Sequence, residues 1–295
     1  MIGNYEKPTE YDYVKDLVER GRPVYCYGDT GCGKSELFRQ IANDLGRKHY
    51  EISGHTEIRP DDFLGYKTAE KGEIEWVDGL LPHAAREGSI LVVNEISAVN
   101  PGILFALHFV LEEDGRIVLT ENEREEVAPQ PGFCLCCTDN TAGIGDSEGM
   151  YAGTQVMNQA FLDRFAATVK LTYLKPKAEQ AALQGRFGKE LDDEDAKTLV
   201  EIANMIRKSN AKGETAILFS TRRLVSLVEN MMAFEKLGMQ GKSAFKTALD
   251  VSILNKIEEA DKGTVVEIIQ RVMGIDLRTG KAKGKADVDE EDKED

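Results

Sequence analysis

A phosphate-binding loop is predicted where a short apolar run, residues 24–27, leads into a complete G-x-x-x-x-G-K-[ST] pattern. Apolar residues at helical spacing follow as far as Gly46, which completes the expected order of strand, turn and helix. Glycines in such a turn let backbone N–H groups point at phosphate oxygens, Lys34 adds a mobile positive charge, and Ser35 offers a hydroxyl to Mg²⁺. We therefore expect this site to bind a nucleoside triphosphate. The residues predicted to bind it are Gly28, Asp29, Thr30, Gly31, Cys32, Gly33, Lys34, Ser35 and Glu36.

Polar residues stand at the ends of two further predicted strands. Residues 89–95 read S-I-L-V-V-N-E, and the apolar run indicates a buried parallel strand whose carboxyl end reaches the ligand edge of a sheet. At that edge the carboxylate of Glu95 can polarise the water that attacks a γ-phosphate. Asn140 follows the next predicted strand and can orient the same water. Arg164, in F-L-D-R-F, is placed to reach the nucleotide of a neighbouring subunit.

The elements that position these residues indicate an α/β domain with a parallel sheet, residues 1–174. Two hairpins are expected within it, one around residues 61–77 and one at residues 116–128. The predicted core strands are residues 24–27, 48–53, 89–95, 133–138 and 169–173.

Beyond this core the pattern is helical, with one weak strand signal at residues 216–219. Residues 175–276 are therefore expected to form a small all-helical domain, and residues 277–295 a disordered acidic tail. The predicted helices are residues 196–207, 222–237, 245–257 and 265–273.

Composition limits the classes of function and the location. The net charge is −15, of which the last fifteen residues carry −3 (four lysines against seven acids), so the remainder is −12 and repels nucleic acid at long range. No apolar run reaches the roughly 20 residues of a membrane span. Five cysteines without disulfide spacing favour a reducing cytoplasm. A metal cluster of Cys134, Cys136 and Cys137 is disfavoured, because alternate strand residues face opposite ways.

Two segments carry a resemblance to a known family. Residues 137–146 read C-T-D-N-T-A-G-I-G-D, and residues 149–164 read G-M-Y-A-G-T-Q-V-M-N-Q-A-F-L-D-R. The second resembles the pattern G-L-Y-x-G-T-Q-x-x-N-Q-A-x-x-D-R, with Met150 in place of leucine. On these motifs the chain resembles the AAA+ ATPases of the MoxR branch, and within it the ATPase subunit of aerobic cobaltochelatase and its relatives.

The resemblance implies ATP and Mg²⁺ as cofactors and a role for each polar residue. Lys34 and Ser35 correspond to Walker A, and Glu95 to the Walker B base. Asn140 corresponds to sensor 1, and Arg164 to an arginine finger that acts in trans. The remaining implied residues are Arg222 as sensor 2, with Arg223 as a second candidate, and Ser35 with Asn94 at the magnesium ion.

The resemblance also implies an assembly and partners. A homo-hexameric ring is expected, with hairpins lining its pore and the helical domain acting as a lid. Hydrolysis would drive remodelling of a partner protein, recruited through a von Willebrand A-type domain, and in the narrower version cobalt insertion into a corrin precursor. Nucleic acid and membranes are not expected as partners.

One departure from the family pattern concerns Asn94, where the family has aspartate. Asparagine keeps an acceptor oxygen but loses the charge, so weaker Mg²⁺ binding and slower turnover are expected. Asn94→Asp is expected to raise the Mg²⁺ affinity and, if chemistry limits turnover, the rate. Two alternatives stay open: a slow nucleotide-gated scaffold, and a nucleic-acid motor or nuclease-associated ring that uses the hairpin residues Lys67, Lys71 and Arg124. Arg164 and Arg222 also have simpler interpretations, as a surface ion-pair partner and an exposed helix residue.

Overall fold

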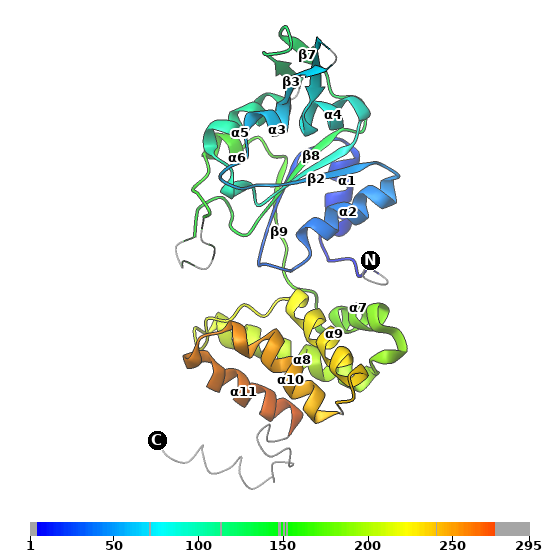
Figure 1. Ribbon diagram of the computed structural model, residues 1–295, viewed down its shortest axis with the longest axis vertical. Helices are drawn as coiled ribbons and strands as arrows, with labels where there is room; N and C mark the ends of the chain where they lie inside the picture. The colour runs from blue at the N-terminus through cyan, green and yellow to red at the C-terminus, as the bar shows by residue number, and fades with distance from the viewer. Residues whose placement is uncertain are drawn as a thin grey trace. The chain divides into compact units, whose positions relative to one another are not determined.

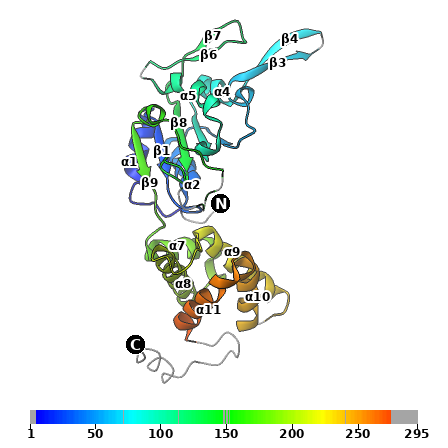
Figure 2. The same cartoon turned by 90° about the vertical axis from the view of Figure 1, so that its left-hand side faces the viewer.

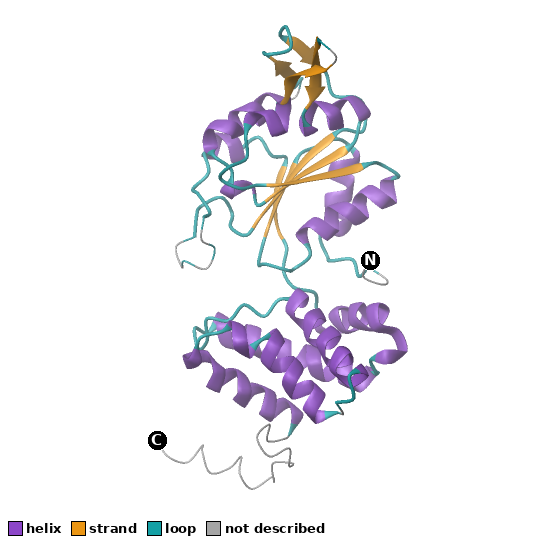
Figure 3. Cartoon of the chain, in the orientation of Figure 1, coloured by secondary structure: helices purple, strands orange, loops and turns teal. Residues whose placement is uncertain are grey.

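The computed structural model describes residues 5–70, 72–112, 114–146, 149, 151, 153–239 and 241–274. Two compact units divide the chain, one formed by Lys7–Thr172 and the other containing the residues from Tyr173 onward. All strands belong to the first unit and the second is helical (Figure 3). Lys71, Met150 and the predicted tail, residues 277–295, lie outside the described residues. Over the described ranges, no helix is both long and apolar enough to cross a bilayer.

The first unit, which we call the α/β unit, is built on a five-stranded parallel sheet with the order β2-β5-β8-β1-β9 (Figure 1). Its register pairs Tyr27 with Asp139 and Ser53 with Asn94, so the carboxyl ends of neighbouring strands emerge at one edge. That edge is where parallel α/β sheets bind their ligands. The strands are β1 (Val24–Tyr27), β2 (His49–Ser53), β5 (Ile90–Asn94), β8 (Cys134–Asp139) and β9 (Ala167–Lys170).

Helices cover both faces of this sheet. Tyr25, Leu91, Leu135 and Cys137 belong to one core cluster with residues of α4, α5 and α6. Alternate strand residues face the other side, where α1 and α2 contact the sheet (Figure 1). The helical segments are α1 (Tyr11–Glu19), α2 (Lys34–Leu45), α3 (Pro60–Leu64), α4 (Leu80–Glu87), η1 (Ile96–Ala98), α5 (Pro101–His108), η2 (Phe109–Leu111) and α6 (Gln159–Leu162).

Two antiparallel hairpins project from the same end of the α/β unit (Figure 2). They are β3 (Gly65–Glu70) with β4 (Glu73–Asp78), and β6 (Ile117–Leu119) with β7 (Glu125–Val127). Arg86 of α4 connects the two hairpins, because its guanidinium donates to Asp78 at the end of β4, at 2.8 Å, and to Glu125 at the start of β7, at 2.7 Å.

The helical unit packs around a second apolar core. A buried ion pair lies within it: both carboxylate oxygens of Glu179 accept from Arg207 at 2.7 Å, and Thr221 donates to one of them at 2.6 Å. This cluster holds α7 and α8 at the beginning of α9. The helical segments are α7 (Pro176–Phe187), η3 (Gly188–Glu190), α8 (Asp193–Ala211), α9 (Thr221–Lys236), α10 (Lys242–Ser252), η4 (Leu254–Lys256) and α11 (Glu259–Met273).

The predicted fold class, the five core strands and both hairpins are confirmed. The weak strand signal at residues 216–219 is wrong: these residues form a loop whose Ile217 and Phe219 are buried in the helical core, which explains their alternation. Helix α7 was not predicted, since few of its residues are buried and the apolar pattern is short. The expected helix over residues 245–257 ends earlier, at Ser252.

Candidate nucleotide-binding site

The predicted phosphate loop connects β1 to α2 at the carboxyl edge of the sheet. Gly28 has φ of 151°, and a Cβ there would lie 2.0 Å from the carbonyl oxygen of Leu171, so no other residue fits this close approach of β1 to the end of β9. The ammonium of Lys34 donates to the carbonyls of Gly28 at 2.7 Å and Asp29 at 3.1 Å. Its third bond goes to Oδ1 of Asn140, at 2.9 Å. The end of β8 is thereby placed directly beside the loop.

Ser35 begins a second set of contacts on the β5 side. Its hydroxyl donates to Oδ1 of Asn94 at 2.7 Å, and the same oxygen accepts from the hydroxyl of Thr138 at 2.8 Å. The amide nitrogen of Asn94 donates to Oε2 of Glu51, on β2, at 2.9 Å. Ser35 and Asn94, the two residues predicted to serve a metal, are therefore in direct contact.

Glu95 has a left-handed backbone conformation. It has φ of 53° and ψ of 45°, an uncommon region for a residue with a Cβ. The conformation turns the chain sharply after β5, and Gly54 permits it, because a Cβ at Gly54 would lie 2.5 Å from the carbonyl oxygen of Glu95. The side chain of Glu95 is exposed, and among the described residues its carboxylate has no hydrogen-bond or ion-pair partner. It is thus free to contact a water molecule.

A buried carboxylate supports the end of β8. Asp139 is 1% exposed and accepts from Ser97 at 2.6 Å, Thr141 at 2.8 Å and Tyr25 at 2.9 Å. Burial, together with the charge of Asp139, raises the pKa of the Tyr25 phenol, so Tyr25 stays a donor. Asp139 therefore connects β1, β8 and η1 immediately before Asn140.

Replacing Asp139 by alanine should lower the free energy of unfolding by about 3 kcal/mol, because buried hydroxyls lose a charged acceptor. Asp139→Asn is the matched control: hydroxyls rotate and can accept from its amide, so its cost should be smaller. Urea unfolding of both variants measures the difference. Equal stability of Asp139→Ala and the parent would show that this cluster does not support the sheet edge.

Some of the predicted loop residues have contacts away from the phosphate-binding turn. Both carboxylate oxygens of Glu36 are engaged by neighbours in α2, Arg39 at 2.7 Å and Gln40 at 2.8 Å. Burial raises the pKa of the Cys32 thiol, which keeps it neutral. Burial, together with the charge of Asp29, raises the pKa of Tyr151 of the family motif.

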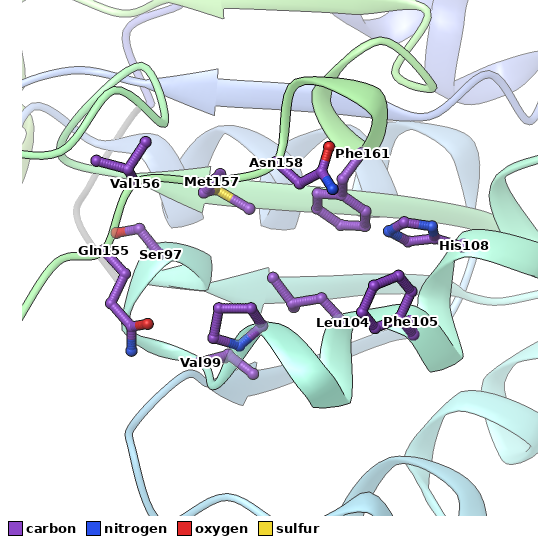
Figure 4. A pocket seen from close by; sticks show the side chains of 11 residues that line it. Ser97, Val99, Leu104, Phe105, His108, Gln155, Val156, Met157, Asn158 and Phe161 are labelled. Atoms are coloured by element: carbon purple, nitrogen blue, oxygen red, sulfur yellow. The ribbon is translucent and has the colours of Figure 1, made fainter.

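A small cavity lies between the segment after β5 and the family-motif segment (Figure 4). Its volume is about 50 Å³, far below the roughly 300–1,000 Å³ of a ligand pocket, so it is not the nucleotide site. The ring of His108 stacks on Phe161 at 5.1 Å between centroids, and Gln155 and Asn158 of the motif also line the cavity (Figure 4). The motif therefore shapes the packing of α5 against α6.

Arg164 follows α6 and is not brought to the loop of its own chain. Its Nε donates to Oε1 of Glu112 at 2.7 Å, and Nη1 donates to the carbonyl of Ala160 at 2.6 Å. These contacts fit the simpler ion-pair interpretation and also hold the guanidinium in a defined place. The role of a finger in trans stays a prediction.

Arg222 and Arg223 lie in the first turn of α9, in the helical unit. Ser220 caps the helix, with its hydroxyl accepting from the Arg223 N–H at 3.1 Å. Arg222 is exposed, whereas Nη1 of Arg223 is buried and has no hydrogen-bond partner among the described residues. Burial lowers the pKa of Arg223. The choice between the two as sensor 2 stays open.

The predicted site missed three residues: Glu51, Thr138 and Asp139. Asp139 directly follows a predicted strand and precedes Asn140, so its position was a usable signal. Thr138 and Glu51 lie in strands whose neighbours are not visible in the sequence. The sulfurs of Cys134 and Cys136 are 3.7 Å apart, whereas Cys137 packs into the core on the opposite face of β8, so the three thiols do not converge.

The donor atoms fit a magnesium ion. Mg²⁺ prefers oxygen ligands, and the hydroxyl of Ser35, the amide oxygen of Asn94 and the carboxylate of Glu51 are connected by hydrogen bonds at this edge. The glycine backbone and Lys34 fit phosphate oxygens. The edge of the sheet therefore has the chemistry of a site for a nucleotide with a divalent cation.

Comparisons with known proteins identify the family of this chain. Residues 23–165 match the family "AAA domain (dynein-related subfamily)", and residues 179–273 match "CbbQ/NirQ/NorQ C-terminal". The aerobic cobaltochelatase subunit CobS of Sinorhizobium sp is 32% identical over 264 residues, which cover 87% of this chain and 77% of CobS. NorQ of Paracoccus denitrificans is 35% identical over 118 residues, 40% of this chain and 43% of NorQ.

A solved structure shows the same fold. A RuvB mutant of Thermotoga maritima superimposes with a TM-score of 0.56 at 16% identity, covering 91% of this chain and 80% of RuvB. At this sequence identity, the similarity to RuvB shows the fold alone. Because the match to CobS spans most of both chains and the C-terminal family is that of NirQ and NorQ, the chain belongs to the MoxR-type AAA+ ATPases.

Proposed function

We propose that this ATPase assembles as a ring and couples Mg²⁺-ATP hydrolysis to the remodelling of a partner protein. One observation supports the hydrolysis in this proposal: at the ends of β1, β5 and β8, Lys34 donates to Asn140, and Ser35, the next residue, donates to Asn94. Glu95 follows directly after β5 with a free carboxylate. These are the groups that phosphoryl transfer to water requires.

Each residue has a role in this proposal. The loop backbone and Lys34 hold the phosphates, and Ser35 with Asn94 holds Mg²⁺, which offsets phosphate charge when bound. Glu95 accepts a proton from the attacking water, and Asn140 orients that water. In the helical unit Arg222 or Arg223 is the proposed sensor 2, on the family's precedent.

The surface around Arg164 supports assembly through this side of the α/β unit. Phe105 is 58% exposed, Phe109 65% and Val156 69%, and all three lie on the elements that surround the small cavity or continue from them. Phe105 and Val156 line the same cavity, and contiguous exposed apolar surface is typical of an interaction site. If a neighbouring subunit covers these side chains, its nucleotide would lie beside Arg164. We propose a hexamer on the family's precedent.

The proposed partner is a protein that carries a von Willebrand A-type domain. CobS is by its name a subunit of an aerobic cobaltochelatase, and it is similar to this chain over most of its length. A cobaltochelatase subunit is therefore the narrower form of the proposal.

A nucleic-acid motor is less well supported. Residues 65–78 hold two basic and four acidic residues, and residues 116–127 also hold two basic and four acidic residues. Lys67 and Arg124 are exposed but stand among these acids. A surface of this charge repels phosphate backbones.

The experiment is Glu95→Gln. It should bind ATP with unchanged affinity and lower hydrolysis about 10²–10⁴-fold, because the general base is lost while the phosphate contacts remain. Bound ATP should therefore be recovered intact after filtration. Glu123→Gln is a matched control, since Glu123 is also an exposed glutamate with positive φ, at 54°.

Three outcomes separate the alternatives. Parental hydrolysis by Glu95→Gln would remove Glu95 as the base. A parent that binds ATP without hydrolysing it would be the nucleotide-gated scaffold. Stimulation of the parent by DNA would favour a nucleic-acid motor.

A further inference from the structure

Asn94 leaves the predicted magnesium site without the aspartate charge, and the structure places another carboxylate beside it. Glu51 lies on β2, which pairs with β5 so that Ser53 is opposite Asn94. Its Oε2 accepts from Nδ2 of Asn94 at 2.9 Å. A full negative charge is therefore one hydrogen bond away from the position where the family pattern has it.

The bond to Glu51 also fixes which end of the Asn94 amide faces Ser35. A carboxylate only accepts hydrogen bonds, so Nδ2 must point at Glu51 and Oδ1 must point away from it. Oδ1 is then the atom that accepts from Ser35 at 2.7 Å and from Thr138 at 2.8 Å. With this orientation the Ser35 hydroxyl uses its proton on Asn94, and its lone pairs remain available for a cation.

The other oxygen of Glu51 is anchored. Oε1 accepts from Nη2 of Arg39, on α2, at 3.0 Å, and it lies 3.4 Å from Nε2 of His49. Arg39 also pairs with Glu36 at 2.7 Å, so its charge is shared between two carboxylates. Glu51 thus keeps a fixed position and is only partly neutralised.

We propose that Glu51 is a positioning residue of the magnesium site and that the Glu51–Asn94 pair replaces the single Walker B aspartate. Glu51 supplies the negative charge from the neighbouring strand, and Asn94 transmits it by presenting its carbonyl oxygen to Ser35. The inference rests on the proposed Mg²⁺-ATP function and names the residue that completes it.

This pair reverses the expectation for Asn94→Asp. An aspartate would place a second carboxylate at the 2.9 Å contact with Glu51, and like charges at that distance disfavour each other. Asn94→Asp alone should therefore weaken Mg²⁺ binding. The double variant Asn94→Asp with Glu51→Gln should restore Mg²⁺ binding, because glutamine can donate to the new aspartate and the total charge of the pair returns to −1.

The test measures the Mg²⁺ dependence of binding of a non-hydrolysable ATP analogue by calorimetry, in the full chain. Glu51→Gln should weaken the apparent Mg²⁺ affinity about 10-fold or more, the range seen for residues that orient metal ligands. Asn94→Asp should weaken it as well, and the double variant should return to within about 3-fold of the parent.

Arg39→Gln is the matched control, since it removes the Arg39–Glu51 ion pair and leaves the Asn94 contact in place. If Glu51 only partners Arg39, then Arg39→Gln and Glu51→Gln should behave alike, and the inference is overturned. It is equally overturned if Glu51→Gln binds Mg²⁺ like the parent, or if the double variant is no better than Asn94→Asp. A parent whose analogue binding is independent of Mg²⁺ would instead remove the proposed function itself.

Discussion

Lys34→Ala should weaken ATP binding about 10³-fold or more. Its ammonium carries three N–H donors at the centre of the loop, and charge-assisted bonds to phosphate contribute about 1.5–3 kcal/mol each. In the structure these donors reach Gly28, Asp29 and Asn140, so the ammonium lies at the point where the loop and β8 meet. Isothermal calorimetry with Mg²⁺-ATP measures the loss.

Lys34→Met keeps the aliphatic stem and removes only the charge, so it should lose nearly as much affinity as Lys34→Ala. Lys67→Met, at an exposed lysine of the first hairpin, should bind as the parent does. Circular dichroism confirms that each variant is folded. Parental affinity in Lys34→Met would remove the loop as the nucleotide site.

Arg164→Ala should leave ATP binding largely intact and lower hydrolysis about 10³–10⁵-fold, the range that arginine fingers contribute by stabilising charge on the transferring phosphoryl group. Within its own chain Arg164 contacts Glu112 and Ala160 rather than the loop. A large loss of hydrolysis with intact binding is therefore the result expected if Arg164 acts on the nucleotide of a neighbouring subunit. Steady-state hydrolysis and nucleotide binding, measured on the same preparation, separate the two effects.

Mixing two inactive variants distinguishes an arginine finger in trans from a local structural role of Arg164. Arg164→Ala and Lys34→Ala subunits, each inactive alone, should regain partial activity together, because some interfaces then pair an intact loop with an intact arginine. Glu112→Gln removes the ion pair but keeps the arginine. If Glu112→Gln is as inactive as Arg164→Ala, or if mixing restores nothing, Arg164 acts through structure within its own subunit.

The amino-acid sequence by itself determined the phosphate loop, the core strands and the place of Asn94, Glu95 and Asn140 at strand ends. These features are local: the loop pattern, the apolar runs and the polar residue after each run all lie within about ten residues. A parallel sheet then brings the strand ends to one edge whatever their order. The contact of Lys34 with Asn140 requires in addition that β8 pairs with β1, which the sheet order supplies.

Only the tertiary structure decided which side chains surround these residues. The sheet order places β2 beside β5, so Glu51 contacts Asn94 across 43 positions of sequence. In the sequence, Asn94 indicates that the aspartate charge of the family pattern is missing. In the fold, Glu51 on the adjacent strand places a carboxylate beside Asn94. The partner of Arg164, 52 positions away, was equally hidden. Hydrogen bonds between side chains depend on strand order and register, and those are fixed by packing over the whole unit rather than by any local pattern.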